Sequence, residues 1–384
     1  HYIEDPPESK MFRPLVCGSF VTATSSLLEL HRRRSPLVSH AEAESATQES
    51  GLEKAIGNTP LIKLESISKA TGCEVYGKAE WLNPSGSVKD RAAKQIVMEA
   101  EKSGKLKPGG TIVEGTGGNT GIALAAIAAA KGYKAVICMP HFIAKEKIRL
   151  CESFGAEVHL QPGVPFTNDE NYAKKAAFFG RTLQNAIHTD QFENEANFRA
   201  HFSGTGPEIW AQSGGKVDAF VCAAGTGGTI GGISSFLKEV SADRVQTFLI
   251  DPHGSQLFNF VKKGELKSLG GGSEIEGIGI GRLTANFKKS VLDGAFRGSD
   301  QEAVDMFQYL MRNEGLCLGP SACLNVVGAV KVARSMPKGS VIVTILCDAG
   351  ERYSTKFMNK EWLREHSLTP SYIKGDGKGV EFVQ

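Results

Sequence analysis

The sequence lacks any uninterrupted apolar run of the roughly 18 residues that a membrane-spanning helix needs. Its longest apolar helix candidate, residues 122–130, is half that length and rich in alanine. An excess of charge of one sign is missing too, because 44 lysines and arginines face 42 aspartates and glutamates. There is also no basic stripe with interleaved aromatic residues. We therefore expect no membrane span and no nucleic-acid partner.

Closely spaced cysteines are missing as well. The eight cysteines are scattered and none forms a C-x-x-C pair, so we expect neither a zinc site nor a redox motif, and no metal. Several cysteines lie inside apolar, strand-like runs such as 136–139 and 345–347. This placement is typical of buried free thiols in a reducing compartment.

The first 50 residues differ in composition from the rest. Residues 1–10 are acidic and precede Met11, so they are either a remnant left by cloning or an alternative upstream start. Residues 11–40 hold one acidic residue, Glu29, against four arginines, with many serines. This composition predicts a transit peptide for mitochondria or another organelle. A disordered tail without targeting, and hence a cytoplasmic protein, is the alternative.

The rest of the sequence has the pattern of an α/β protein. The chain of 384 residues, 41% hydrophobic and 22% charged, is long enough for two domains. Short apolar runs alternate with helix-like segments, which predicts largely parallel sheets. The runs are continuous rather than alternating, so both sheet faces should be covered by helices. The expected strands are 73–79, 111–114, 134–139, 157–160, 182–187, 217–223, 246–250 and 340–347. The expected helices are 88–103, 119–131, 144–154, 169–179, 196–213, 229–240, 255–263, 299–314 and 322–334.

We divide the chain into four parts. Residues 1–50 form the leader, 51–190 an N-terminal domain and 191–360 a C-terminal domain. Residues 361–384 form a tail, within which the polar sequence predicts a loose segment over 364–384. Within the first domain, residues 51–82 could pack with the second domain instead.

The first candidate site segment is 83–91, Asn-Pro-Ser-Gly-Ser-Val-Lys-Asp-Arg. Asn-Pro-Ser-Gly signals a turn, and an apolar-periodic helix then begins at Val88. Ser87 could therefore be an N-cap, and Lys89 would lie in the first helical turn. The positive end of the helix dipole disfavours a cation there, which favours the neutral amine that a Schiff base needs. An ordinary exposed lysine is the alternative.

Two glycine-rich loops each follow an expected strand and open a helix. Residues 114–121, Glu-Gly-Thr-Gly-Gly-Asn-Thr-Gly, could hold a carboxylate with backbone N–H groups and hydroxyls, or could simply turn the chain. Residues 225–229, Gly-Thr-Gly-Gly-Thr, combine glycine N–H groups, two hydroxyls and a helix N-terminus, which predicts a phosphate site. No Gly-Lys-Ser/Thr follows, and Ile230 breaks the G-x-G-x-x-G pattern, so a P-loop nucleotide is not indicated.

Two weaker segments complete the set. Ser321 in residues 319–322 precedes a helix-like run and could simply be its N-cap. Residues 276–281, Glu-Gly-Ile-Gly-Ile-Gly, lie in an irregular glycine-rich stretch, 264–297, that is too long for a plain connection. Such a segment suits a loop that closes over a site.

In order and spacing these segments resemble the β-family of pyridoxal-phosphate (PLP) enzymes, fold type II, and within it the cysteine synthase and cystathionine β-synthase group. The likeness runs from residues 56–61, Ile-Gly-Asn-Thr-Pro-Leu, to residues 348–353, Asp-Ala-Gly-Glu-Arg-Tyr. The pattern Asn-Pro-x-Gly-Ser-x-Lys-Asp-Arg at 83–91 is highly specific to it. The resemblance implies two open, mostly parallel twisted sheets flanked by helices, as in tryptophan synthase β, with the active site between two domains.

The resemblance also implies roles for single residues. Lys89 would hold PLP as a Schiff base and move the α-proton, and Asn119 would hydrogen-bond the ring hydroxyl. Ser321 would face the pyridine nitrogen, where a neutral hydroxyl does not force ring protonation, and this suits β-elimination. The phosphate would be bound by Gly225, Thr226, Gly227, Gly228 and Thr229. The substrate would meet Thr116, Gly117, Gly118, Asn119, Thr120, Gln191 and Gly277.

Three residues depart from the family's common pattern. Gly117 stands where common members have serine, so one hydroxyl contact to the substrate is lost. Asp190 stands where they have glutamine, so either Asp190 or Gln191 could meet the carboxylate. Cys323 replaces a common glycine. These changes leave PLP binding in place and bear on the choice of substrate.

The implied reaction is a β-replacement that forms L-cysteine from O-acetyl-L-serine and sulfide through an α-aminoacrylate intermediate. Cystathionine β-synthase, cysteine desulfhydrase and β-cyanoalanine synthase activities would use the same residues. A non-enzymatic alternative is a PLP-binding scaffold for serine acetyltransferase, a partner that some family members bind. By analogy with the family we expect a homodimer.

Overall fold

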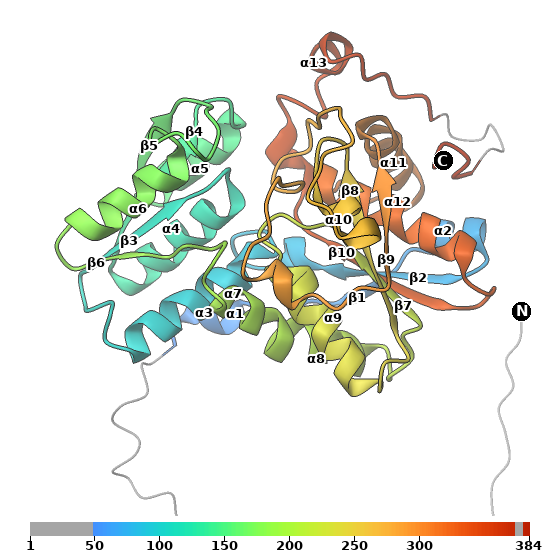
Figure 1. Cartoon of the computed structure of the whole chain (residues 1–384), viewed down its shortest axis with the longest axis horizontal. Coiled ribbons are helices and arrows are strands. Elements are labelled where there is room, and N and C mark those ends of the chain that lie inside the picture. Colours follow the sequence, from blue (N-terminus) through green and yellow to red (C-terminus); the bar gives the residue numbers. More distant parts are fainter. Residues whose placement is uncertain (1–48, 373–378) are drawn as a thin grey trace, which may run out of the picture. The chain divides into compact units, whose positions relative to one another are not determined.

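The computed structural model describes residues 49–372 and 379–384 (Figure 1). The predictions for the leader therefore lie outside the described residues, apart from its last two positions. All seven cysteines of the described part are free thiols. No helix in this part is both long enough and apolar enough to cross a membrane.

Two sheets form the framework of the described chain (Figure 1). The larger has the order β1-β2-β10-β7-β8-β9 and the smaller has the order β5-β4-β3-β6. Neighbouring strands are parallel except for β1 and β2. The predicted α/β class with two open, mostly parallel sheets is thus confirmed. The strands are β1 Leu61–Lys63, β2 Glu74–Ala79, β3 Thr111–Gly115, β4 Lys134–Pro140, β5 Glu157–Gln161, β6 Ala186–His188, β7 Ala219–Cys222, β8 Gln246–Pro252, β9 Gly294–Gly298 and β10 Val341–Leu346.

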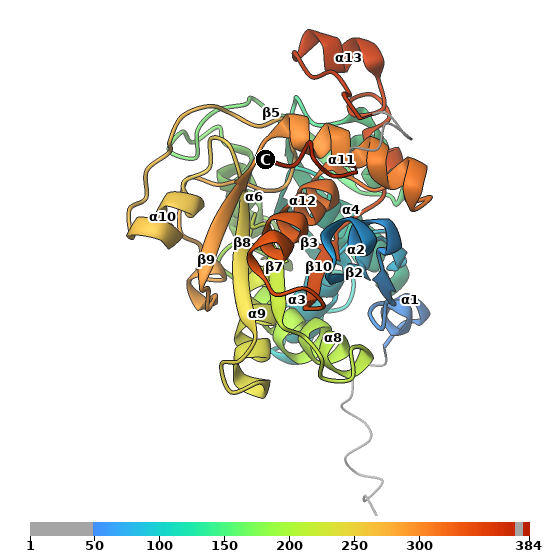
Figure 2. The ribbon, with the colours of Figure 1, turned by 90° about the vertical axis from the view of Figure 1, so that its right-hand side faces the viewer.

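Helices connect the strands and cover both sheets. In Figure 2, helices α2, α11 and α12 lie in front of the larger sheet. The α-helices are α1 Gly51–Ala55, α2 Glu65–Thr71, α3 Lys89–Lys102, α4 Asn119–Lys131, α5 Lys145–Ser153, α6 Tyr172–Thr182, α7 Ala196–Ala200, α8 Gly206–Gln212, α9 Gly228–Val240, α10 Leu257–Lys263, α11 Asp300–Asn313, α12 Pro320–Ser335 and α13 Lys360–Glu365. Shorter turns are η1 Glu80–Leu82, the π-helical η2 His201–Thr205, η3 Phe287–Lys289 and η4 Gly350–Tyr353.

The strands are apolar on both faces because each sheet separates two hydrophobic clusters. On β10, Ile342 and Leu346 pack with α11 and α12, whereas Val343 and Ile345 pack with α9. In the smaller sheet, Ile112 of β3 joins a cluster with α4, and its neighbour Val113 packs toward α6. Successive side chains of a strand point to opposite faces, so a continuous apolar run buries both.

The first two strands belong to the sheet of the C-terminal half. Strand β2 pairs in parallel with β10 along its whole length, from Glu74 opposite Val341 to Ala79 opposite Leu346. This is the arrangement that the sequence allowed for residues 51–82. The chain then leaves the larger sheet, enters α3, and builds the smaller sheet from β3 to β6.

Several elements differ from the prediction. Strands β1 and β9 were not expected, because β1 has three residues and β9 begins and ends with glycine inside the stretch 264–297. The segment 182–187 begins as the last residue of α6, and only Ala186–His188 is a strand. The helix expected over 196–213 is interrupted by the π-helical η2, which carries the buried His201.

The prediction of a loose C-terminal tail was wrong for the residues that the structure describes. Tyr372 and Val383 are buried, and the Tyr372 ring lies 5.0 Å from that of Tyr309. Arg334 donates to the carbonyl of Val380 at 3.1 Å. A few well-spaced apolar side chains are enough to fix a polar segment when they reach the main hydrophobic cluster.

An ion-pair cluster ties α3 to the larger sheet and to α8. Arg91 on α3 contacts Glu80 and Glu208, each at 2.7 Å, and Lys78 of β2 contacts Glu208 at 2.7 Å. Lys78 and Glu80 are fully buried. Burial alone would raise the pKa of Glu208. Arg91 and Lys78 outweigh this effect through their hydrogen bonds and positive charges, and they lower the pKa of Glu208 to about 2. Two cations and two carboxylates thus balance in the interior.

We expect Glu208→Gln to lower the free energy of unfolding by about 2–4 kcal/mol at pH 7, because Arg91 and Lys78 would keep only one carboxylate between them. The pKa of Glu208 lies below its ordinary 4.5, so the ion-pair contribution is present above that pH and is lost as pH falls toward 2. The difference between the two proteins should therefore shrink as pH falls below about 5. Urea unfolding at several pH values measures it.

The exposed Glu239→Gln at the end of α9 is the matched control, for which little change is expected. An equal effect of the two substitutions would contradict the assignment.

Candidate active site

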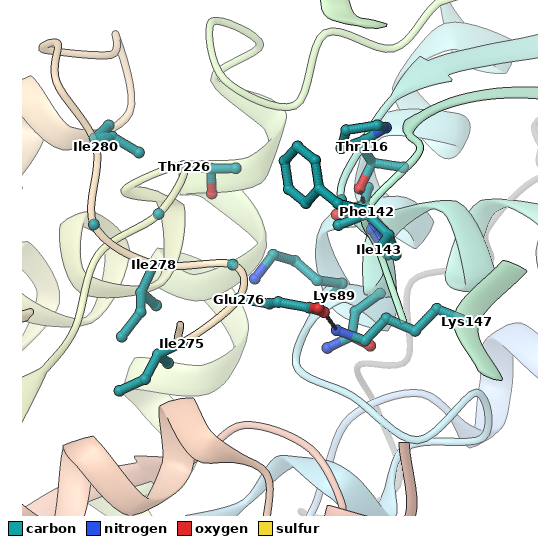
Figure 3. Close-up of a pocket in the computed structure, with 18 of the residues that line it drawn as sticks. Lys89, Thr116, Phe142, Ile143, Lys147, Thr226, Ile275, Glu276, Ile278 and Ile280 are labelled. Atoms are coloured by element: carbon teal, nitrogen blue, oxygen red, sulfur yellow. Dashed lines mark hydrogen bonds and ion pairs between the residues drawn. The ribbon is translucent and has the colours of Figure 1, made fainter. Parts of the chain in front are cut away.

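A cavity of about 310 Å³ lies where the loops after β3, β6 and β7 meet the start of α3 (Figure 3). A second cavity of about 40 Å³ shares several of its residues and is also lined by Ser321 of α12. Lys89, Asn119 and Thr226 line both. Every predicted site residue except Gly228 lines one cavity or the other.

Lys89 is the first residue of α3 and extends into the larger cavity (Figure 3). The helix begins one residue later than expected, with Val88 at the N-cap position, but the Ser87 hydroxyl still accepts the Lys89 N–H at 3.2 Å. The preceding turn is closed by the buried Asp90, which accepts hydrogen bonds from the Ser85 N–H at 2.7 Å and its hydroxyl at 2.8 Å. Asn83 donates to the Ser87 carbonyl at 3.2 Å. Asn83, Ser85, Ser87 and Asp90 therefore hold the turn that positions Lys89.

The loop 225–229 follows β7 and opens α9, with its backbone close to other segments. A Cβ atom on Gly225 would lie 2.1 Å from the Gly277 carbonyl oxygen, and Gly227 adopts a positive φ of 86° against Phe287. Gly228 does not face the cavity but packs on Asn197, 2.0 Å from where its Cβ would be. Glycine is thus needed for packing at all three positions. The loop opens α9, and the first N–H groups of a helix have no partner within the helix, which suits a phosphate.

Two side chains outside the predicted set support this loop. The Asn197 amide donates to the Thr226 hydroxyl at 2.9 Å. The His201 ring lies with Nε2 3.2 Å from the Thr229 hydroxyl and Nδ1 2.8 Å from the Thr205 hydroxyl. Burial, reinforced by the charge of Arg91, holds the pKa of His201 well below its ordinary range, so the ring is neutral. The π-helical turn η2 brings this ring to the loop.

Ser321 lies inside α12 rather than at its cap. Gly319 is the N-cap residue, and Pro320 is the first residue of the helix. The alternative interpretation of Ser321 as an N-cap was therefore wrong. Its hydroxyl lies instead at the smaller cavity, together with Cys222 and Cys347. Burial raises the pKa of the Cys347 thiol to about 12, so this wall carries no thiolate.

The loop 116–120 runs from β3 into α4. Gly118 adopts a φ of 146°, and a Cβ atom there would lie 2.4 Å from the side chain of Lys147. Gly117 is different, since its Cβ would meet only Ile143, at 3.4 Å. The Thr120 hydroxyl donates to the Gln191 side chain at 2.6 Å. The loop is therefore shaped by Gly118 and leaves room at Gly117.

Of the two residues left open for the carboxylate, Gln191 lines the cavity and Asp190 does not. Asp190 has a φ of 47°, and its side chain accepts the Glu193 N–H at 3.4 Å, so it shapes the following turn. Behind Gln191 lies the buried Glu114, which accepts the Thr189 hydroxyl at 2.5 Å and the Gln191 N–H at 3.1 Å. Burial raises the pKa of Glu114 to about 7 despite these donors.

A charged group at the cavity was not predicted. Lys147 of α5 contacts Glu276 at 2.6 Å (Figure 3). Lys356 contacts the same carboxylate at 2.6 Å. The Lys147 amine also lies 4.2 Å from the centre of the Tyr353 ring. No local signal could reveal this group, because Lys147 and Glu276 are 129 positions apart in the chain. It connects α5 of the smaller-sheet half to the segment 273–280.

These observations fit PLP. The chain presents an amine at Lys89, a glycine loop suited to a phosphate, and a neutral hydroxyl at Ser321 in the wall of the smaller cavity. Within residues 49–372 and 379–384, no group of three or more histidine, cysteine, aspartate or glutamate side chains is placed to hold a metal ion.

Comparison with known proteins agrees. Residues 52–348 match the family described as pyridoxal-phosphate dependent enzyme. Cysteine synthase 1 of Neurospora crassa is 52% identical over 83% of this chain and 85% of its own length. Cysteine synthase of Dictyostelium discoideum is 47% identical over 87% of this chain and 89% of its own length. The crystal structure of an O-acetylserine dependent cystathionine beta-synthase from Helicobacter pylori superposes with a TM-score of 0.72, with 33% identity over 79% of this chain and 97% of that one. This chain belongs to the family of pyridoxal-phosphate-dependent enzymes.

Proposed function

We propose that this enzyme is a cysteine synthase, which forms L-cysteine from O-acetyl-L-serine and sulfide. The observation that carries the proposal is the position of Lys89, at the head of α3 between the phosphate loop and the loop 116–120. Relatives that are 47–52% identical and named cysteine synthase support it. PLP bound at this lysine supplies an electron sink for the charge that develops at the substrate α-carbon.

Separate groups of residues would bind the cofactor, orient the substrate and transfer the proton. The phosphate loop and Ser321 would hold the cofactor at its two ends, and Asn119 would meet its ring hydroxyl. The loop 116–120 and Gln191 would orient the substrate carboxylate through N–H groups and hydroxyls. Lys89, once its amine is free, would take the α-proton and later return it. Acetate leaves from the β-carbon, and a sulfide sulfur bonds to that carbon in its place.

The segment 273–280 would act as the cover of the site. It is joined to α5 by the Lys147–Glu276 pair, which is almost fully buried. Its backbone approaches the phosphate loop, since Gly279 donates to the Ala224 carbonyl at 2.9 Å. A cover of this kind keeps water from a reactive intermediate before sulfide arrives.

A larger thiol is the second candidate acceptor. The Helicobacter pylori neighbour bears the name of a cystathionine beta-synthase that depends on O-acetylserine. Lys147 and Lys356 place two ammonium groups at the cavity, which Glu274 and Glu276 also line. Either ammonium group would offer a partner to the carboxylate of homocysteine. Rates with sulfide and with homocysteine, measured side by side, separate the two.

Location and assembly are further proposals. We infer import into mitochondria or another organelle from the composition of residues 11–40. A homodimer and an association with serine acetyltransferase are inferred from the family resemblance alone. A fluorescent fusion of residues 1–50 and the sedimentation of the purified enzyme would test the location and the dimer.

The visible absorption spectrum tests the cofactor and the reaction. The purified enzyme should show the band of a PLP Schiff base, which O-acetylserine should change and sulfide should restore. Lys89→Ala should abolish the band and lower the rate of cysteine formation by roughly a thousandfold. Lys102→Ala, exposed at the end of the same helix, should leave both unchanged. A wild-type protein without the band after PLP is supplied would refute the assignment.

Gly117→Ser tests the substrate loop. The site has room for the added side chain, and its hydroxyl could donate to the substrate carboxylate. One hydrogen bond contributes about 0.5–1.5 kcal/mol, so KM for O-acetylserine should fall roughly two- to tenfold with kcat little changed. Gly118→Ser is the contrasting variant, because φ and Lys147 both exclude a side chain there, and it should raise KM. An unchanged KM in Gly117→Ser would mean that the loop does not touch the carboxylate.

A further inference from the structure

The side chain of Asn119 is held from both ends. Its Nδ2 group donates to Asp348 Oδ2 at 2.7 Å, and its Oδ1 accepts from Arg352 Nη1 at 2.7 Å. A flipped amide would set donor against donor and acceptor against acceptor. The contacts therefore admit one orientation, in which Nδ2 keeps a second hydrogen free.

Asp348 is buried and held in place at its contact with Asn119. It is fully buried, and the Tyr353 hydroxyl donates to the same Oδ2 atom at 2.8 Å. Burial, together with the charge of Asp348, raises the pKa of Tyr353 well above its ordinary range, so Tyr353 stays a donor. The other oxygen of Asp348, Oδ1, has no partner among the described residues and lies against Gly319, where a Cβ atom would come within 2.0 Å of it.

Arg352 connects Asn119 to the turn that carries Lys89. Its Nη2 group donates to the Ser85 carbonyl, and Gly86 has a φ of 79° beside the same guanidinium. Ser87 also forms an isolated β-bridge with Asp348. The planar guanidinium serves both acceptors at once, from two nitrogen atoms held in a fixed geometry that a lysine ammonium lacks.

We propose that Asp348 and Arg352 are positioning residues, which lock the Asn119 carboxamide so that it presents an N–H group to the ring hydroxyl of PLP. The inference rests on the proposed binding of PLP at Lys89. In PLP the aldehyde and the hydroxyl stand on adjacent ring carbons, so the groups that meet them must be fixed relative to each other. Arg352 polarises the amide through its oxygen and makes the free N–H a stronger donor. The locked amide thus stabilises the ionised form of the ring hydroxyl.

The test uses the holoenzyme spectrum and the affinity of the apoenzyme for PLP. In Arg352→Lys and Asp348→Asn, the Asn119 amide can turn, so absorbance should move from the visible band to the near-ultraviolet band. The dissociation constant for PLP should rise roughly threefold to tenfold, the effect of about one hydrogen bond. Glu351→Gln, an exposed neighbour of Arg352, should leave both quantities unchanged.

A double-mutant cycle separates positioning from a general structural role. If Arg352 acts through Asn119, Arg352→Lys should change neither the band ratio nor the PLP affinity further in an Asn119→Ala background. Equal effects of Arg352→Lys in both backgrounds would overturn the proposal, as would wild-type spectra and affinities in the single variants. A wild-type protein that forms no visible band with PLP would instead refute the proposed function, and this inference with it.

Discussion

The parallel pairing of β2 with β10 is the constraint on which the site depends. It joins segments 267 positions apart, Glu74 with Val341, and continues six residues to Ala79 and Leu346. Beyond the ladder, the Val88 N–H donates to the Cys347 carbonyl at 2.9 Å. The turn that carries Lys89 and the segment that carries Asp348 therefore lie side by side, beyond the carboxyl ends of the two paired strands. The pairing therefore sets the position of the Lys89 turn relative to Asp348.

Charge is distributed unevenly around the two cavities. The smaller cavity is lined by Lys89 and Glu276, but its wall around Ser321 is neutral, with the raised-pKa thiol of Cys347 and with Thr229, which is backed by a neutral His201. The charged side chains Lys147, Glu276 and Lys356 line the larger one. A neutral hydroxyl such as that of Ser321 does not force protonation of a pyridine ring, which leaves a milder electron sink suited to elimination at the β-carbon. The charged residues instead lie where the proposed closure of the segment 273–280 over the site would occur.

Much of the fold and the contiguous parts of the site could be predicted from the sequence, because their signals are local. The Asn-Pro-Ser-Gly-Ser-Val-Lys segment and the two glycine loops are each encoded in fewer than ten residues, and all three line the cavities. The Asn119 contacts could not be found this way, because Asp348 and Arg352 are 229 and 233 positions away. Strand β9 was not predicted from the sequence, because it begins and ends with glycine, which is typical of a loop. The π-helical turn at His201 was not predicted, because its residues continue the pattern of the surrounding helix.

The charged group at the cavity bears on how easily the site can reopen. Lys147 belongs to α5 of the smaller-sheet half, whereas Glu276 and Lys356 both belong to the half with the larger sheet. Separation of the halves would break Lys147–Glu276 and leave Lys356–Glu276 intact, so Glu276 would never be left without a cation. A carboxylate stripped of every partner in a buried site would cost several kcal/mol, whereas an ion pair that opens into water costs about 1 kcal/mol or less. The shared carboxylate would thus favour the proposed closure only slightly and leave it readily reversible, which suits an enzyme that must release its product after each turnover.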